Sequence, residues 1–288
     1  MPGYRNLLVH LDAGTEAPER LKHAAALAAR FDAHLTGLAL VAEPSVAAIM
    51  GGPMPSAAEA EMLEKMREQR VEAQEQRAGQ LRARFDDAVR AEGIRGDFQI
   101  ARTVAGHLAD TLAVYARYFD LAILGQEDPE APDLTRLAPA EVVLSSGRPA
   151  LVLPAIPAPA EIGRHVLVAW DAGQAATRAV NDAMPLLQQA ETVTVVTINA
   201  EASETGHGAL PGADIALHLA RHEVEASVQE LQNPKVSEDQ ALLSYAADVG
   251  ADMMVMGAYG HSRLREWVLG GVTRGMLRTM TLPLLLSH

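Results

Sequence analysis

The sequence predicts an α/β fold with mainly parallel sheets, built from two tandem copies of one domain. Short apolar runs alternate with helical patterns along the 288 residues, as they do where helices cover a parallel sheet. An internal repeat indicates the two copies. Residues 7–14 match residues 166–173, because both are apolar runs that end in Asp-Ala-Gly. Residues 120–125 match residues 252–257, and each copy closes with an apolar run entered through proline.

In the first copy, apolar runs predict strands and helical periodicity predicts long helices. The strands are expected at residues 6–11, 35–41, 98–101, 121–124 and 148–153, and the helices at residues 18–31, 58–92 and 104–118. Prolines and glycines in residues 43–57 predict a loop. From Asp12 to Gly125 is 113 residues, against 86 from Asp171 to Gly257. We therefore expect an insertion of 27 residues in the first copy, mostly one long, partly exposed helix.

The second copy repeats this order after a proline-rich, stiff linker at residues 154–159. Its strands are expected at residues 165–170, 192–198, 252–256 and 284–286, and its helices at residues 175–189, 214–232, 238–249 and 271–280. The predicted domains are therefore residues 1–156 and residues 160–288.

Composition excludes several classes of function. The net charge of −13 argues against non-specific nucleic-acid binding, because the phosphates would be repelled. The chain has no cysteine, which excludes disulfides, thiolate catalysis and cysteine-based zinc sites. No apolar stretch reaches the length of a membrane span, and the N-terminus lacks a signal-peptide pattern. We therefore expect a soluble, cytoplasmic protein.

The most specific motif is a set of glycines near the C-terminus. Gly257 and Gly260 follow an apolar strand, and after nine residues Gly270 and Gly271 open a helix. Glycines let backbone amides approach a bound anion, and a helix start with free N–H groups suits a phosphate. This pattern resembles the nucleotide loop of the universal stress protein family. The family usually has Ser or Thr where this chain has Gly271, and the hydroxyl of Thr273 could replace the one that is lost.

The resemblance to tandem universal stress proteins implies two Rossmann-like α/β domains, each with a five-stranded, mainly parallel sheet flanked by helices. It also implies that the copies pair through their last strands as an intramolecular pseudo-dimer, with a homodimer as a further option. The implied ligand is ATP or AMP, with no metal beyond the magnesium that accompanies a nucleotide. The implied site lies in the second copy and comprises Ala169, Trp170, Asp171, Met256, Gly257, Gly260, Gly270, Gly271, Val272 and Thr273.

Each of these residues has a simpler interpretation beside the functional one. Asp12 and Asp171 lie just past the first strand of each copy, where α/β sheets bind ligands, but either could instead turn the chain and cap the next helix. The glycines could belong to an ordinary strand–turn–helix connection. His218 and His222 have a zinc-ligand spacing, with His207 as a third ligand, yet a solvated helix face is favoured.

The first copy has lost the glycine pattern. Gly125 is followed by Gln-Glu-Asp-Pro-Glu, and the matching helix start carries Glu141. These carboxylates would repel a triphosphate, so this copy is either degenerate or binds something other than a nucleotide.

Three functions stay open at this point. The first is an adenine-nucleotide-binding protein of the stress response, with at most slow ATP hydrolysis. The second is a non-nucleotide member acting as an interaction module or small-ligand carrier. The third is an adenylating enzyme, for which His261 is the one catalytic candidate.

Overall fold

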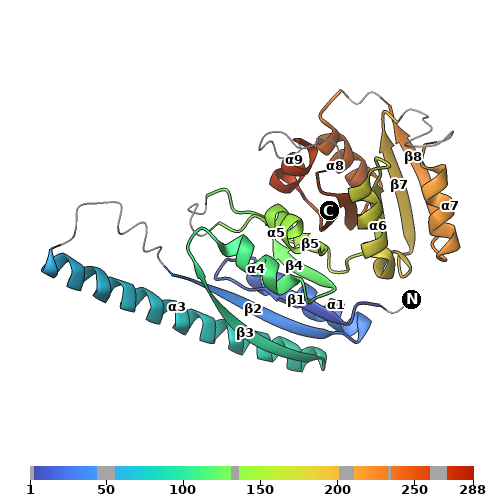
Figure 1. Cartoon of the computed structure of the whole chain (residues 1–288). Helices are drawn as coiled ribbons and strands as arrows, with labels where there is room; N and C mark the ends of the chain where they lie inside the picture. The colour runs from blue at the N-terminus through green and yellow to red at the C-terminus, as the bar shows by residue number, and fades with distance from the viewer. Residues whose placement is uncertain (1–2, 44–55, 131–135, 201–210, 233–234, 260–270) are drawn as a thin grey trace.

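The structure, a computed structural model, describes residues 3–43, 56–130, 136–200, 211–232, 235–259 and 271–288. Ten strands form one continuous sheet in the order β3-β2-β1-β4-β5-β10-β9-β6-β7-β8 (Figure 1). Five strands come from each half of the chain, and all pairs within a half are parallel. The predicted fold class, two tandem α/β domains with five-stranded sheets, is therefore confirmed.

The elements of the first half are β1 Asn6–His10, α1 Ala17–Phe31, β2 His34–Glu43, α3 Ala57–Glu92, β3 Arg95–Val104, α4 Leu108–Ala116, β4 Leu121–Gly125, α5 Pro139–Ser146 and β5 Ala150–Leu153. Those of the second half are β6 His165–Ala169, α6 Gln174–Leu187, β7 Thr192–Ile198, α7 Ala213–Arg221, β8 Ala226–Leu231, α8 Glu238–Asp248, β9 Met253–Gly257, α9 Gly271–Thr279 and β10 Leu284–Ser287.

The two halves repeat one another in detail. Gly125 ends β4 and Gly257 ends β9, and each of these strands pairs with the first strand of its own half. A carboxylate also repeats. Asp120 accepts hydrogen bonds from the backbone amides that lead into β1, and Asp252 accepts those that lead into β6. The predicted internal repeat is thus visible in strand pairing and in the hydrogen bonds that begin each half.

Helices cover both faces of the sheet. α1, α3, α6 and α7 pack into one core cluster, and α4, α5, α8 and α9 into the other. Side chains of the central strands alternate between the two clusters, as in β1, where Leu7 and Val9 face the first and Leu8 the second. Because both faces are covered, the central strands are apolar throughout, which is why the sequence reveals them clearly.

The halves are joined by an antiparallel pair of closing strands. Leu284 lies opposite Val152 and Leu286 opposite Ala150, so β5 and β10 make the sheet continuous. On one side of this junction, the Tyr4 hydroxyl donates to the Asp182 carbonyl at 2.7 Å. The sequence prediction of an intramolecular pairing through the last strands agrees with this arrangement.

The inserted segment forms the predicted helix, α3. A capping box begins it, in which Ser56 and Glu59 exchange backbone and side-chain hydrogen bonds. Leu81 and Phe85, in its C-terminal part, are buried against the sheet, whereas Met62 near its start is 61% exposed. Figure 1 shows this first part extending beyond the edge of the sheet. Of the predicted loop at residues 43–57, residues 44–55 lie outside the described part of the chain.

The sequence prediction was wrong at the two edge strands. The expected helix at residues 214–232 is in fact α7 followed by a turn and β8, and Glu223 has a positive φ of 64° in that turn. β3 is longer than expected, so α4 begins at Leu108 instead of residue 104. Edge strands are exposed over much of their length, as β8 is at Ser227, Val228 and Gln229. Their pattern is therefore not the apolar run of a central strand.

Candidate functional sites at the carboxyl edges of the two half-sheets

Part of the predicted nucleotide site lies together at the carboxyl edge of the second half. Ala169, which ends β6, is paired with Met256 of β9, and Gly257 follows it. Trp170 is half-buried, and its backbone amide donates to the Val196 carbonyl at 2.9 Å. Gly260 and Gly270, two of the predicted phosphate-binding glycines, lie outside the described residues, as do Arg263, Arg265 and His261 of the same connection.

Asp171 turns the chain after β6. Its carboxylate accepts the backbone N–H of Gly173 at 2.8 Å, and Ala172 between them has a φ of 58°. Asp12 makes the same turn in the first half by accepting the N–H of Gly14 at 2.9 Å. Both residues therefore turn the chain, as the simpler interpretation expected. Neither caps the helix that follows through its side chain, so that second part of the interpretation does not hold. Asp171 is exposed, so its turn leaves it accessible from solvent.

Gly257 has a packing role that sequence reasoning missed. A Cβ at this position would overlap the Ala176 backbone nitrogen and lie 2.6 Å from the Ala175 carbonyl carbon of α6. The glycine therefore allows α6 to begin directly against the end of β9. At Gly271, by contrast, an added Cβ would have no atom of the described residues within 4 Å. Close packing thus explains the first glycine and does not explain the second.

Thr273 and Val272 lie in the first turn of α9. Thr273 is 3% exposed, and its hydroxyl oxygen accepts the backbone N–H of Tyr259 at 3.2 Å. This bond holds Tyr259 at a φ of 62°, close to the end of β9. The Thr273 hydroxyl therefore fixes the backbone of Tyr259, where the chain leaves β9.

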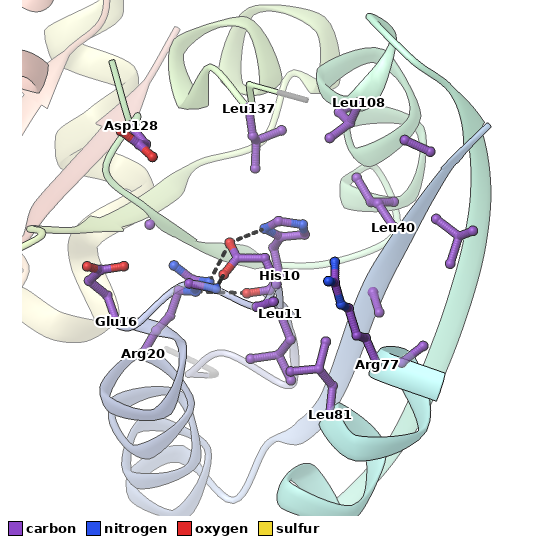
Figure 2. Close-up of a pocket in the computed structure, with 18 of the residues that line it drawn as sticks. His10, Leu11, Glu16, Arg20, Leu40, Arg77, Leu81, Leu108, Asp128 and Leu137 are labelled. Atoms are coloured by element: carbon purple, nitrogen blue, oxygen red, sulfur yellow. Dashed lines mark hydrogen bonds and ion pairs between the residues drawn. The ribbon is translucent and has the colours of Figure 1, made fainter. Parts of the chain in front are cut away.

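The other half has a cavity at the matching sheet edge. A cavity of about 380 Å³ opens at the carboxyl edge of β1 and β4, beneath α3 (Figure 2). Its walls come from the ends of β1, β2 and β4, from the first turn of α1, from α3 and from the start of α4. It occupies the position that corresponds to the predicted nucleotide site of the second half.

A buried ion pair forms one wall of this cavity. Arg20 of α1 has a side chain only 4% exposed, and its Nη2 donates to Asp12 Oδ2 at 2.8 Å. Its Nε donates to the His10 carbonyl, also at 2.8 Å. A Cβ on Gly125 would overlap Nη1 of this guanidinium. Gly125 thus makes room for an arginine, whereas its counterpart in the second half makes room for a helix.

Charge in this wall is set by burial and by the arginine. Burial lowers the pKa of His10 to about 4, although the neighbouring Asp12 favours the protonated ring. Burial would raise the pKa of Asp12, but the Arg20 charge, His10 and the hydrogen bonds from Gly14 and Arg20 together outweigh it, and the pKa of this carboxyl lies below its usual value. At neutral pH His10 is therefore uncharged beside a charged Asp12–Arg20 pair.

The long helix supplies the opposite wall. Gln74, Arg77 and Leu81 of α3 all line the cavity. Sequence reasoning missed these residues, and also Arg20 and His10. Two signals were available: His10 is a polar residue within an apolar strand, and Arg20 lies one turn before Ala24, on the buried face of its helix.

The proposed metal spacing gains no support. The rings of His218 and His222 are 4.7 Å apart, and His207 lies outside the described residues. Within the described residues no three His, Asp or Glu side chains are grouped so that they could hold a metal ion. No helix in the same part of the chain is long and apolar enough to cross a membrane.

Comparison with known proteins agrees with the repeat. The sequence profile of the universal stress protein family matches residues 3–125 and again residues 163–288. A curated universal stress protein of Synechocystis sp. is 40% identical over 47 residues, which is 16% of each chain.

Two solved structures share the fold over nearly the whole chain. A universal stress protein from Archaeoglobus fulgidus superposes with a TM-score of 0.71 and 13% identity, covering 98% of this chain and 95% of its own. A putative universal stress protein from Pseudomonas aeruginosa superposes with a TM-score of 0.59 and 18% identity, covering 99% and 93%. Since the family profile matches both halves separately, this chain belongs to the universal stress protein family, with two family domains in tandem.

Proposed function

We propose that the second half binds an adenine nucleotide, ATP or AMP, at the carboxyl edge of its sheet. The phosphates would lie at the start of α9, and the base beside Trp170 and Asp171. We further propose that this binding serves a response to stress in the cytoplasm. The glycine spacing after β9, which resembles the nucleotide loop of the family, supports this assignment from the sequence.

The observation that carries the proposal is the open, acid-free start of α9. The first turn of α9 contains no acidic residue, and an added Cβ on Gly271 would meet no atom of the residues that the structure describes. A helix start of this kind offers unpaired N–H groups and the positive end of the helix dipole to an anion. The matching helix of the first half, α5, begins with Pro139 and carries Glu141 in its first turn. The contrast favours the second half as the phosphate site.

The role proposed for the site is binding. Asp171 is the one carboxylate in the predicted set, so a magnesium ion would be carried by the nucleotide phosphates and not by a protein cage. The exposed Asp171 can accept a hydrogen bond from the ribose or the adenine amino group while it holds its turn.

The test is a matched pair of substitutions at Gly271. Gly271→Ala adds a methyl group into open space, and Gly271→Asp adds a carboxylate at the same place. Both should fold, since acidic residues are favourable in the first turn of a helix. Titration calorimetry with Mg-ATP and with AMP should give similar affinity for the unmodified and Gly271→Ala proteins. Gly271→Asp should bind ATP at least about tenfold more weakly, because the carboxylate would repel the phosphates.

Two outcomes would contradict the proposal. One is no ATP binding by the unmodified protein at millimolar nucleotide, and the other is equal affinity for Gly271→Asp and Gly271→Ala. A second pair compares the halves: Gly260→Val should block ATP binding, whereas Asp128→Val, at the matching place in the first half, should leave it unchanged.

A further inference from the structure

We propose that the cavity of the first half binds a small apolar molecule that carries a single carboxylate, with Arg77 as its anchoring charge. This ligand class differs from the nucleotide proposed for the second half, and the site uses different residues. It would make the protein a carrier of a small organic acid.

The cavity has the size and the walls of a site for a small organic molecule. Its volume of about 380 Å³ lies at the lower end of the roughly 300–1,000 Å³ typical of such sites. Most of its wall is aliphatic, contributed by five separate elements or connections. The larger apolar residues are Leu11, Leu40, Val41, Leu81, Leu108 and Leu137. Figure 2 shows Leu40, Leu108 and Leu137 arranged around the His10 ring. An apolar body of a ligand would displace water from these surfaces.

Charge at the cavity distinguishes an anion from other ligands. The charge of Arg20 is already paired with Asp12, and its Nε donates to the His10 carbonyl. Arg77, in contrast, makes no hydrogen bond or ion pair with any residue that the structure describes, and it lines the cavity. Figure 2 shows its guanidinium extending from α3 toward the space below His10 and Leu40. An unpaired guanidinium beside an apolar wall is suited to a carboxylate, which it can bind through two parallel hydrogen bonds.

The acidic residues of the cavity limit how much negative charge it can accept. Glu16 and Asp128 also line it, and Figure 2 shows them together on the side away from Arg77. A triphosphate spanning the cavity would meet these carboxylates, whereas a single carboxylate can sit at Arg77 and keep its apolar part elsewhere. The distribution of charge around the cavity therefore favours a ligand with a single negative charge, placed beside Arg77 of α3.

A buried nitrogen atom of His10 without a hydrogen-bond partner among the described residues supports the proposal that a molecule binds in the cavity. His10 Nδ1 is buried and has no hydrogen-bond partner among the described residues, since Asp12 Oδ2 is 3.7 Å away. Buried polar atoms are nearly always paired, and an exception calls for a bound group or water molecule. His10 is uncharged at neutral pH, so it does not compete with Arg77 for the carboxylate.

The test uses three ten-carbon probes that differ only in the head group: decanoate, decanol and decylamine, all below their micelle concentrations. Calorimetry on the full chain should show saturable one-to-one binding of decanoate, tighter than that of decanol or decylamine. Because Arg77 is exposed, Arg77→Gln should weaken decanoate binding about threefold to fivefold and leave decanol binding unchanged. Arg84→Gln is the matched control, because Arg84 is an exposed arginine of the same helix that does not line the cavity.

A second variant tests the cavity itself. Leu137→Trp, in the connection before α5, should fill the space and weaken decanoate and decanol alike while the protein stays folded by circular dichroism. Equal affinity for decanoate and decanol with no effect of Arg77→Gln would overturn the anionic ligand. Tighter binding of decylamine would assign the site to the acidic side instead. ATP affinity measured on the same variants should not change. The experiment can therefore refute the carboxylate site of the first half without refuting the nucleotide site of the second half, and the reverse.

Discussion

Gly125 and Gly257 occupy equivalent strand ends, yet the structure predicts that they resist substitution for different reasons. Neither has a positive φ, so alanine is not excluded by its backbone conformation. At Gly257 a Cβ would overlap the backbone nitrogen of Ala176, and only a movement of α6 can relieve this. At Gly125 a Cβ would overlap the end of the Arg20 side chain, whose Cζ would lie 3.2 Å away. The second clash can be relieved by displacing one side chain.

The expected costs follow from what must move. Overpacking against backbone typically costs about 1–3 kcal/mol, so we expect Gly257→Ala to lower the free energy of unfolding by about 3 kcal/mol. Gly125→Ala should displace the guanidinium from the His10 carbonyl and Asp12, both at 2.8 Å. Hydrogen bonds to charged groups contribute roughly 1.5–3 kcal/mol each. Because the Asp12 side chain is 44% exposed and can be rehydrated, a total of about 2 kcal/mol is expected.

A double-mutant cycle separates the two mechanisms. In an Arg20→Met background the clash partner is gone, so Gly125→Ala should cost less than about 0.5 kcal/mol, a coupling of at least about 1.5 kcal/mol. Gly257→Ala should cost the same in both backgrounds. The measurement is urea unfolding at neutral pH, with midpoint and slope compared for all six proteins. The reasoning fails if Gly125→Ala costs as much without Arg20 as with it, or if Gly257→Ala is neutral.

Two further predictions concern charge and hydrogen bonding. The pKa of His10 is lowered from 6.5 to about 4, so the unfolded chain binds more protons between these values, and stability should fall as pH drops through this range. His10→Asn should flatten that fall by about 2 kcal/mol, read from unfolding free energies at pH 7 and pH 4.5; an unchanged slope would mean that His10 is not the titrating group. Asp252 is buried and accepts the amides of Gly163, Arg164 and His165, whereas Asp120 is less buried and accepts two. Asp252→Asn should therefore destabilise by about 2 kcal/mol and Asp120→Asn by less, and the reverse order in thermal unfolding would contradict this.

The central strands could be predicted from the sequence because each is a short apolar run and the same pattern occurs in both halves. Strands buried on both faces must be apolar along their whole length, and such runs stand out between amphipathic helices. The repeat of Asp-Ala-Gly after β1 and β6 added an independent check. The edge strands could not be recognised in this way. β8 exposes polar side chains, and only its pairing with β7 identifies it as a strand.

The predicted site was a different kind of problem. Sequence spacing could bring Ala169, Trp170 and Asp171 to the same sheet edge as Gly257, and the structure agrees. It could not show that Gly257 is required by the approach of α6, because that contact depends on how a distant helix packs. The cavity of the first half was harder still. It needs residues of α3, such as Arg77, to reach the cavity from a helix that packs on α1, β2 and β3, and no local pattern gives that placement.

If the first half binds the proposed carboxylate ligand, its sheet edge is a rebuilt site and not a decayed one. Decay of a phosphate loop would remove glycines and leave unrelated side chains in their place. Instead, Gly125 is kept and Arg20 occupies the space beside it, 4% exposed and bonded to Asp12 and to the His10 carbonyl. A buried arginine is costly unless every such partner is in position, so this arrangement must be specified by the sequence. The inserted α3 then adds Arg77 and an aliphatic wall on the open side. A buried ion pair, an inserted wall and a cavity at the same sheet edge are the three features that support the carboxylate site proposed for this half.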